Sequence, residues 1–288
     1  MSAGALALVL AAAVLHAGWN ALAKRARSQL CFLWLAIVVA TALFVPLAVP
    51  RLLEGGVPSA AWPYVAATVA LHALYFYTLG RAYGSGDFSV VYPVARGLGV
   101  ALVPVVALAL FDERLSPLGT TGVALVIAGI VSLQLAGRGV TGVAGRLLRP
   151  GAGTWWALLT GLSIAGYSLV DKAGVARVHP VPYIALMFLG MGALLVPVVL
   201  ADRPALAREW RVNWPAIVAA AAMTITAYLL VLFAFRLSKA GYVVAAREVS
   251  IVLSAVIGSV WFREGALAPR LAGAAVVLAG VACVALAR

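Results

Sequence analysis

The sequence predicts an all-α polytopic membrane protein whose ten transmembrane helices form two inverted repeats of five helices. Three observations support this fold class. The 288 residues are 65% hydrophobic and only 10% charged, with a mean hydropathy of +1.08, whereas soluble domains are about 45–50% apolar and about 25% charged. The apolar stretches are about 20 residues long, which is the length that a helix needs to cross the hydrocarbon core. The second half of the sequence also repeats the first.

Apolar segments follow one another along the whole chain, separated by turn-forming residues such as Glu54-Gly55-Gly56 and Ser116-Pro117. The first segment has no basic region before its apolar run, so we expect it to remain as a helix and not to be a cleaved signal peptide. We expect helices at 3–23, 31–50, 60–80, 88–111, 117–137, 154–171, 181–201, 214–235, 240–262 and 268–287.

The repeat is clearest between residues 94–131 and 245–282, which align without a gap. In this alignment Arg96 corresponds to Arg247, Glu113 to Glu264 and Gly122 to Gly273. Five spans is an odd number, so the second copy enters the membrane in the opposite sense, as in transporters built from inverted repeats. We expect a first repeat at 1–137, a connecting loop at 138–153 and a second repeat at 154–288.

The net charge of +12 is typical of nucleic-acid-binding proteins, but its distribution argues against that class. Nearly all Lys and Arg residues lie in short loops between spans, where they orient helices and contact anionic lipid headgroups. Twelve of them fall on the side of the first loop and seven on the side of the N-terminus, which favours periplasmic termini. We expect membrane lipids and a small-molecule substrate as partners, with no nucleic acid, and both a monomer and a homodimer remain open.

Paired motifs begin each half of the chain. Gly18-Trp19-Asn20 with Lys24 matches Gly166-Tyr167-Ser168 with Lys172, and Phe111-Asp112-Glu113 matches Phe262-Arg263-Glu264 ahead of a glycine pair. With these motifs the whole chain resembles the EamA family of the drug/metabolite transporter superfamily. The segments 16–20 and 92–96 also resemble a branch associated with phosphonate use. The resemblance implies an EamA-type repeat fold, metabolite transport across the bacterial cytoplasmic (inner) membrane, and basic residues on the fourth and ninth spans that contact substrate.

Arg96 and Arg247 are the strongest candidates for substrate binding. Each lies seventeen residues before a repeated glutamate and about 10–13 Å inside its expected helix, within hydrocarbon depth. A guanidinium stays charged and offers a fork suited to carboxylate or phosphate oxygens, so the pair predicts an anion clamp. The alternative is an arginine that snorkels to the interface or pairs with a carboxylate.

Other polar residues inside the spans form a second group of candidates. Glu248 is either a proton-coupling carboxylate or a permanent counter-ion of Arg96 or Arg247. His16 and His72 either take up protons near neutral pH or form a hydrogen bond to a neighbouring helix, and we expect Asp171 to be part of a helix-end pair with Lys172. Lys24 and Lys172 either guide anions or anchor helices. Trp19, Asn20, Tyr92 and Tyr167 are expected to line a solvated cavity. None of the histidines has a partner at metal-ligand spacing, so we expect no metal and no cofactor.

These features predict a secondary transporter of a small anionic metabolite, such as a phosphonate, phosphate ester or carboxylate, that works by alternating access. The alternative is an exporter of amino acids or other zwitterions, in which one arginine holds the carboxylate; a lipid-phosphate flippase also needs a basic site at this depth. The sequence has no P-loop, so ATP hydrolysis by this chain is excluded. His16, His72 and His179 are scattered and lack catalytic partners, so we expect no enzyme activity.

Overall fold

The computed structural model describes residues 1–85, 88–135, 151–260 and 267–287, and within these ranges the protein is helical without strands. The helices are α1 (Ala3–Lys24), α2 (Gln29–Gly55), α3 (Trp62–Ser85), α4 (Phe88–Phe111), α5 (Pro117–Leu135), α7 (Ala152–Val175), α8 (Pro180–Val199), α9 (Arg203–Leu237), α10 (Ala240–Arg247), α11 (Val249–Val260) and α12 (Leu267–Leu286), with short 3₁₀ turns η1 (Ser59–Ala61) and η2 (Leu200–Asp202). The all-α class of the prediction is confirmed.

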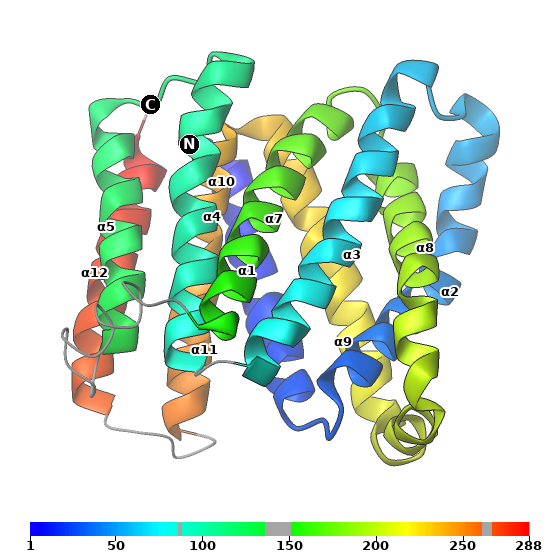
Figure 1. Ribbon diagram of the computed structural model, residues 1–288. Helices are drawn as coiled ribbons and strands as arrows, with labels where there is room; N and C mark the ends of the chain where they lie inside the picture. The colour runs from blue at the N-terminus through cyan, green and yellow to red at the C-terminus, as the bar shows by residue number, and fades with distance from the viewer. Residues whose placement is uncertain (86–87, 136–150, 261–266, 288) are drawn as a thin grey trace.

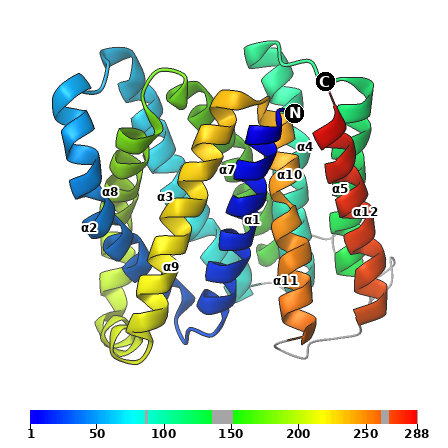
Figure 2. The ribbon, with the colours of Figure 1, turned by 180° about the vertical axis from the view of Figure 1, so that it is seen from behind.

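The helices stand side by side along a common direction, and both chain termini lie at the same end of the bundle (Figure 1). Seen from behind, α1 and α9 cross the middle of the bundle while α5 and α12 form one flank (Figure 2). The helix α1 runs away from the end that carries the termini, whereas α7 runs towards it. The two helices that open the expected repeats therefore have opposite directions.

The packing pairs the helices in the way that a two-fold relation requires. The helix α3 packs on α7, and its counterpart α9 packs on α1; likewise α4 packs on α7, and α10 with α11 packs on α1. The helices α2 and α8 contact each other, as do α5 and α12. This pattern is the one expected of inverted repeats. Residues 136–150 lie outside the described ranges, so the boundaries 137, 138, 153 and 154 remain a prediction.

The repeated glycines make the contact between α5 and α12. A Cβ on Gly122 would lie 2.7 Å from the carbonyl oxygen of Gly280, and a Cβ on Gly280 would lie 2.6 Å from the carbonyl oxygen of Gly122. Gly129 and Gly273 are equally crowded by backbone atoms of the facing helix. Small residues let helix backbones approach closely in membranes, and here the two copies of the motif pack on each other.

Several helices extend beyond their expected ranges, such as α2 and α3, which each end five residues later than expected, and two spans differ more strongly. The eighth span, expected at 214–235, begins earlier, at Arg203, because Asp202 caps the helix by accepting a hydrogen bond from the Ala205 amide (3.0 Å). The ninth span, expected as one helix over 240–262, breaks at Glu248 into α10 and α11. At this break the Glu248 amide donates to the Ala245 carbonyl, three residues earlier (3.1 Å). This is the tighter hydrogen-bond pattern of a 3₁₀ turn and not that of an α-helix.

The outer surface of the bundle is apolar. Large side chains such as Leu43, Leu47 and Leu53 are exposed, and four helical stretches of the described residues are long and apolar enough to cross a membrane: Ala3–Lys24, Gln29–Gly55, Val94–Phe111, and Pro180–Leu237, which holds α8 and α9. Exposed tryptophans also lie in the first turns of α3 and α7, at positions 62 and 155, where indole rings anchor helices at the membrane–water interface.

Candidate functional site

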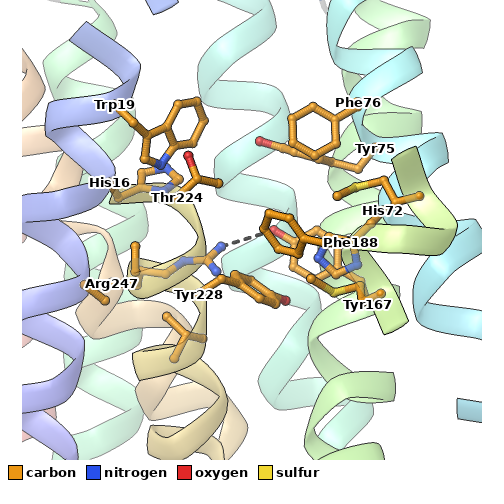
Figure 3. Close-up of a pocket in the computed structure, with 15 residues that line it drawn as sticks. His16, Trp19, His72, Tyr75, Phe76, Tyr167, Phe188, Thr224, Tyr228 and Arg247 are labelled. Carbon is orange, nitrogen blue, oxygen red and sulfur yellow. Dashed lines mark hydrogen bonds between the residues drawn. The ribbon is translucent and has the colours of Figure 1, made fainter. Parts of the chain in front are cut away.

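A cavity opens among six helices in the middle of the bundle (Figure 3). Its lining is aromatic and aliphatic, with a few polar groups that converge on it: Ala12, His16 and Trp19 of α1; His72, Tyr75 and Phe76 of α3; Tyr167 of α7; Met187, Phe188 and Met191 of α8; Thr224, Ala227, Tyr228 and Val231 of α9; and Arg247 of α10. Mostly apolar concave sites with few placed polar groups are typical of small-molecule binding.

Arg247 supplies the positive charge of the cavity wall. Its side chain is 4% exposed, and its Nη2 donates a hydrogen bond to the Tyr167 hydroxyl at 3.2 Å, drawn as the dashed line in Figure 3. Its Nε has no hydrogen-bond partner among the described residues. A buried guanidinium that is only partly satisfied is costly unless a ligand completes it.

Arg96 occupies a different position from its repeat counterpart. Its Nη2 lies 2.9 Å from Oε1 of Glu248, and its Nε donates to Oε2 at 3.1 Å. Both side chains are buried, at 5% and 1% exposure, so the two groups form a bidentate pair of the strong, directional kind. Of the alternatives that the sequence left open for Glu248, this geometry is that of a counter-ion to Arg96. Neither residue is among those that line the cavity.

Asp171 lies behind the cavity wall and is wholly buried. Its Oδ1 accepts hydrogen bonds from Thr68 Oγ1 (2.5 Å) and from the Tyr183 hydroxyl (2.8 Å), and its Oδ2 accepts one from the Tyr228 hydroxyl. His72 Nε2 lies 4.0 Å from Oδ2. The sequence had suggested a helix-end pair between Asp171 and Lys172, but the structure places the carboxylate in a cluster of hydroxyls from three other helices.

Lys172 points away from this cluster towards the end of the bundle. Its Nζ donates to the carbonyl oxygens of Phe235 (2.6 Å) and Ser238 (2.7 Å) and lies 3.3 Å from Oε1 of Glu113. Glu113 in turn accepts a hydrogen bond from the Ala240 amide (2.6 Å). These contacts tie the ends of α4, α7 and α9 to the start of α10, which supports the anchoring alternative for Lys172.

The remaining sequence candidates fall in and around the cavity. His16, His72, Trp19 and Tyr167 line it. Asn20 donates from Nδ2 to the His16 carbonyl oxygen (2.7 Å) and is not part of the lining, and Lys24 lies exposed at the last turn of α1. The side chain of Tyr92 lies outside the described part of the chain, as does Glu264.

Two features of the site were not foreseen from the sequence. One is the role of Asp171, which the sequence placed in a helix-end pair with Lys172, although an acidic residue directly after the uncharged stretch 154–170 was a signal comparable with that of Glu248. The other is the aliphatic and aromatic wall from α8, at Met187, Phe188 and Met191. Nothing in their sequence pattern separates these three from ordinary core residues, because each is also almost fully buried.

Known protein families match both halves of the chain. The model of the EamA-like transporter family matches residues 151–286, and that of the small multidrug resistance proteins matches residues 29–126. A crystal structure of a protein with 19% sequence identity superposes with a TM-score of 0.78 over 99% of this chain and 97% of the other. At that identity the superposition shows a shared fold.

Curated relatives match over shorter stretches. A multidrug transporter of Pseudomonas aeruginosa is 43% identical over 49 residues (17% of this chain, 44% of the relative). A membrane protein of Bacillus subtilis, YvaE, is 41% identical over 63 residues (22% and 51%). The spermidine export protein MdtI of Salmonella arizonae is 36% identical over 61 residues (21% and 56%). The chain thus spans about half the length of the curated relatives it matches.

These matches confirm the resemblance that the paired motifs indicated. Neither family model describes an enzyme; both describe membrane transport proteins. With an EamA-like second half and a first half that matches the small multidrug resistance proteins, the chain is similar in both halves to transporters of the drug/metabolite type.

Proposed function

We propose that this protein is a secondary transporter of the bacterial inner membrane that carries a small metabolite with one anionic group by alternating access between its two halves. The observation that supports this best is the guanidinium of Arg247. It lies buried in the cavity wall, bonds to Tyr167, and keeps an Nε without a hydrogen-bond partner among the described residues. A carboxylate, phosphonate or phosphate-ester oxygen is the natural acceptor for that group.

The pairing of Arg96 with Glu248 narrows the substrate class. A clamp of two arginines would suit a doubly charged phosphate, but Arg96 is already neutralised by a buried carboxylate. The cavity therefore offers one guanidinium, which matches one anionic group on the substrate. Among the anions considered from the sequence, a monocarboxylate or a phosphonate monoanion fits this balance better than a dianionic phosphate monoester such as a sugar phosphate.

A zwitterionic substrate, such as an amino acid, is the second candidate, and the aromatic lining favours it. Trp19, Tyr75, Phe76 and Tyr228 surround the cavity opposite and beside Arg247 (Figure 3). Aromatic faces attract ammonium groups by cation–π interaction, worth about 0.5–2 kcal/mol. One of the matched relatives is named for the export of spermidine, a polyamine, so cationic groups are handled by a related protein.

Ligand-induced thermal stabilisation of the purified protein tests the proposal. The probes are acetate, methylphosphonate, glycerol phosphate, alanine and spermidine. At a concentration about 100 times the dissociation constant, a ligand stabilises the native state by about 2.7 kcal/mol, which is readily measured as a rise in Tm. We expect stabilisation by acetate or methylphosphonate for the first candidate and by alanine for the second.

Variants of Arg247 decide whether the site is the one proposed. Arg247→Gln removes the charge, and Arg247→Lys keeps the charge but not the fork; Arg208→Gln changes an exposed arginine of α9 and is the control. Stabilisation should disappear in Arg247→Gln, weaken in Arg247→Lys and persist in Arg208→Gln. Stabilisation by spermidine alone, with equal size in all four proteins, would contradict an anion-binding site at Arg247.

A further inference from the structure

We propose that Asp171 and His72 together form a proton-binding site at the wall of the cavity. The site is separate from Arg247 and from the Arg96–Glu248 pair. Its existence does not depend on the substrate, and only its role as the site of the coupling ion rests on the proposed function. Three properties of the described residues support it: the isolation of the carboxylate from water, the hydrogen-bond roles of the imidazole, and the contact of both groups with the cavity lining.

The first property is the burial of Asp171 deep within the helical bundle. The side chain is 0% exposed, and hydroxyl groups from α3, α8 and α9 surround it, namely those of Thr68, Tyr183 and Tyr228. An ionised carboxylate can accept all three bonds. Hydroxyl groups bring no charge, so the negative charge of Asp171 calls for a positive partner nearby.

Among the ion pairs of the described residues, that partner is His72. The neighbouring cation on the same helix, Lys172, instead faces Glu113 and the end of α9. The ionisable groups that face the Asp171 cluster are His72 from α3, Tyr167 from α7, Tyr183 from α8, Tyr228 from α9 and Arg247 from α10. Arg247 donates to the hydroxyl of Tyr167, whose ring stacks on His72.

The second property follows from the hydrogen bonds of His72. Its Nδ1 lies 3.0 Å from both the carbonyl oxygen and Oγ1 of Thr68. The carbonyl can only accept, and Oγ1 donates its hydrogen to Asp171, so we assign the hydrogen to Nδ1. In a neutral imidazole Nε2 is then an acceptor with a lone pair. Nε2 is buried, has no hydrogen-bond partner among the described residues, and faces Oδ2 of Asp171 at 4.0 Å.

The Nε2 lone pair of His72 and Oδ2 of Asp171 are two acceptors that face each other in a buried site, so one proton can bind between them. When a proton from water adds to Nε2, the imidazolium and the carboxylate become an ion pair; when it leaves, the lone pair and the carboxylate again oppose each other. Histidine is the side chain whose ordinary titration lies near physiological pH. The pair is therefore built to hold one exchangeable proton, and the unpartnered Nε2 marks its place.

The third property links the proton to the cavity. His72 and Tyr228 are part of the lining, the His72 ring stacks on Tyr167 with centroids 4.2 Å apart, and the Tyr167 hydroxyl accepts the bond from Arg247. A proton on His72 adds a second positive charge to the cavity wall, besides that of Arg247, so it favours an anion in the cavity and disfavours a cation. An anionic substrate and the proton would consequently bind together.

Infrared difference spectroscopy of the purified protein, titrated from about pH 5 to about pH 9, tests the site with the proton as the only ligand. Asp171→Asn removes the carboxylate at equal size, and His72→Asn keeps an amide donor for the Thr68 carbonyl but has no Nε2. The control is Glu209→Gln, which changes another buried carboxylate, one that accepts bonds from the Ser28 amide and from Asn213.

We expect wild-type protein and Glu209→Gln to share a titrating imidazole band that is absent from both Asp171→Asn and His72→Asn. The proposal is overturned if both variants titrate like the wild type, or if the band is lost only in Asp171→Asn. Should Asp171→Asn fail to fold, His72→Asn decides by the same criterion. No substrate is present, so a negative result leaves the proposed transport function standing, and a failure of the substrate probes leaves the proton site standing.

Discussion

The buried pair of Arg96 and Glu248 makes the most demanding prediction of the structure. Removing one partner, by Arg96→Met or Glu248→Met, leaves the other charge buried without its counter-ion. Such a loss costs about 3–5 kcal/mol. The upper part of that range is appropriate because the pair is bidentate, with contacts of 2.9 and 3.1 Å, and both side chains are at most 5% exposed.

The double variant Arg96→Met/Glu248→Met removes both charges together. Replacing a buried ion pair by apolar side chains of similar volume is often neutral or stabilising by about 1–4 kcal/mol. The two single changes should therefore be strongly non-additive, with a coupling free energy of at least about 3 kcal/mol in the double-mutant cycle. For comparison, Arg114→Met breaks an ion pair with Asp112 that is about 80% exposed, and we expect it to cost less than about 1 kcal/mol.

Thermal unfolding of the purified variants measures these differences. On the scale of soluble domains, about 2–4 °C of Tm corresponds to 1 kcal/mol for 150–250 residues, so each single variant should lose on the order of 10 °C while the double variant stays near the wild type. If the double variant loses as much as the two single variants added together, the charges act independently and the assignment of Glu248 as the counter-ion of Arg96 is wrong. If it keeps its fold but loses all ligand-induced stabilisation, Arg96 contacts substrate after all.

Three further predictions concern packing, anchoring and pH. Gly122→Ala places a Cβ 2.7 Å from the Gly280 carbonyl oxygen and should destabilise the folded protein by about 1–3 kcal/mol. A Cβ on Gly80 meets nothing within 4 Å, so Gly80→Ala should not destabilise it. Thermal unfolding measures the difference between the two variants. Lys172→Met removes the donor to the Phe235 and Ser238 carbonyls and the ion-pair partner of Glu113, so it should destabilise the protein by about 1–3 kcal/mol. Ligand-induced stabilisation should be unchanged, and its loss would place Lys172 in the substrate site. In the loop before α8, burial together with the charges of Arg51 and Arg236 lowers the pKa of His179, whose Nδ1 accepts a hydrogen bond from the Val181 amide. The unfolded chain therefore binds the proton more readily than the folded protein, so the free energy of unfolding should fall as the pH drops below about 6.5. His179→Asn, which keeps a capping oxygen, should remove that part of the pH dependence.

Much of the fold was predictable because the length and hydrophobicity of a membrane span can be read directly from the sequence. The expected segments 3–23 and 88–111 differ by at most one residue from α1 and α4, since an apolar run bounded by turn residues fixes both ends. The close contact of Gly122 with Gly280 also agrees with the packing role that their spacing suggested. The break at Glu248 was not predictable, because no proline or glycine marks it.

The site was only partly predictable, for a different reason. Trp19, Tyr167 and Arg247 were candidates by residue type and depth, and the structure brings them to one cavity. The partners of Arg96 and Asp171 could not be deduced, because Glu248 lies 152 positions from Arg96 and Thr68 lies 103 from Asp171 along the chain. Which buried charge neutralises which depends on helix rotation, and rotation is set by packing against neighbouring helices.

The divergence of the two halves at matched positions explains how a symmetric scaffold can hold an asymmetric site. Trp19 and Tyr167 are repeat counterparts and both line the cavity. Arg96 and Arg247 are counterparts too, but Glu248, which stands where the first half has Gly97, forms its bidentate pair with Arg96 and not with its neighbour Arg247. Asp171 likewise stands where the first half has Ala23. Glu248 leaves one guanidinium at the cavity, and Asp171 lies behind the cavity wall, where we propose a proton-binding site, so the substitutions that break the repeat are those that distinguish the chemistry of the two halves.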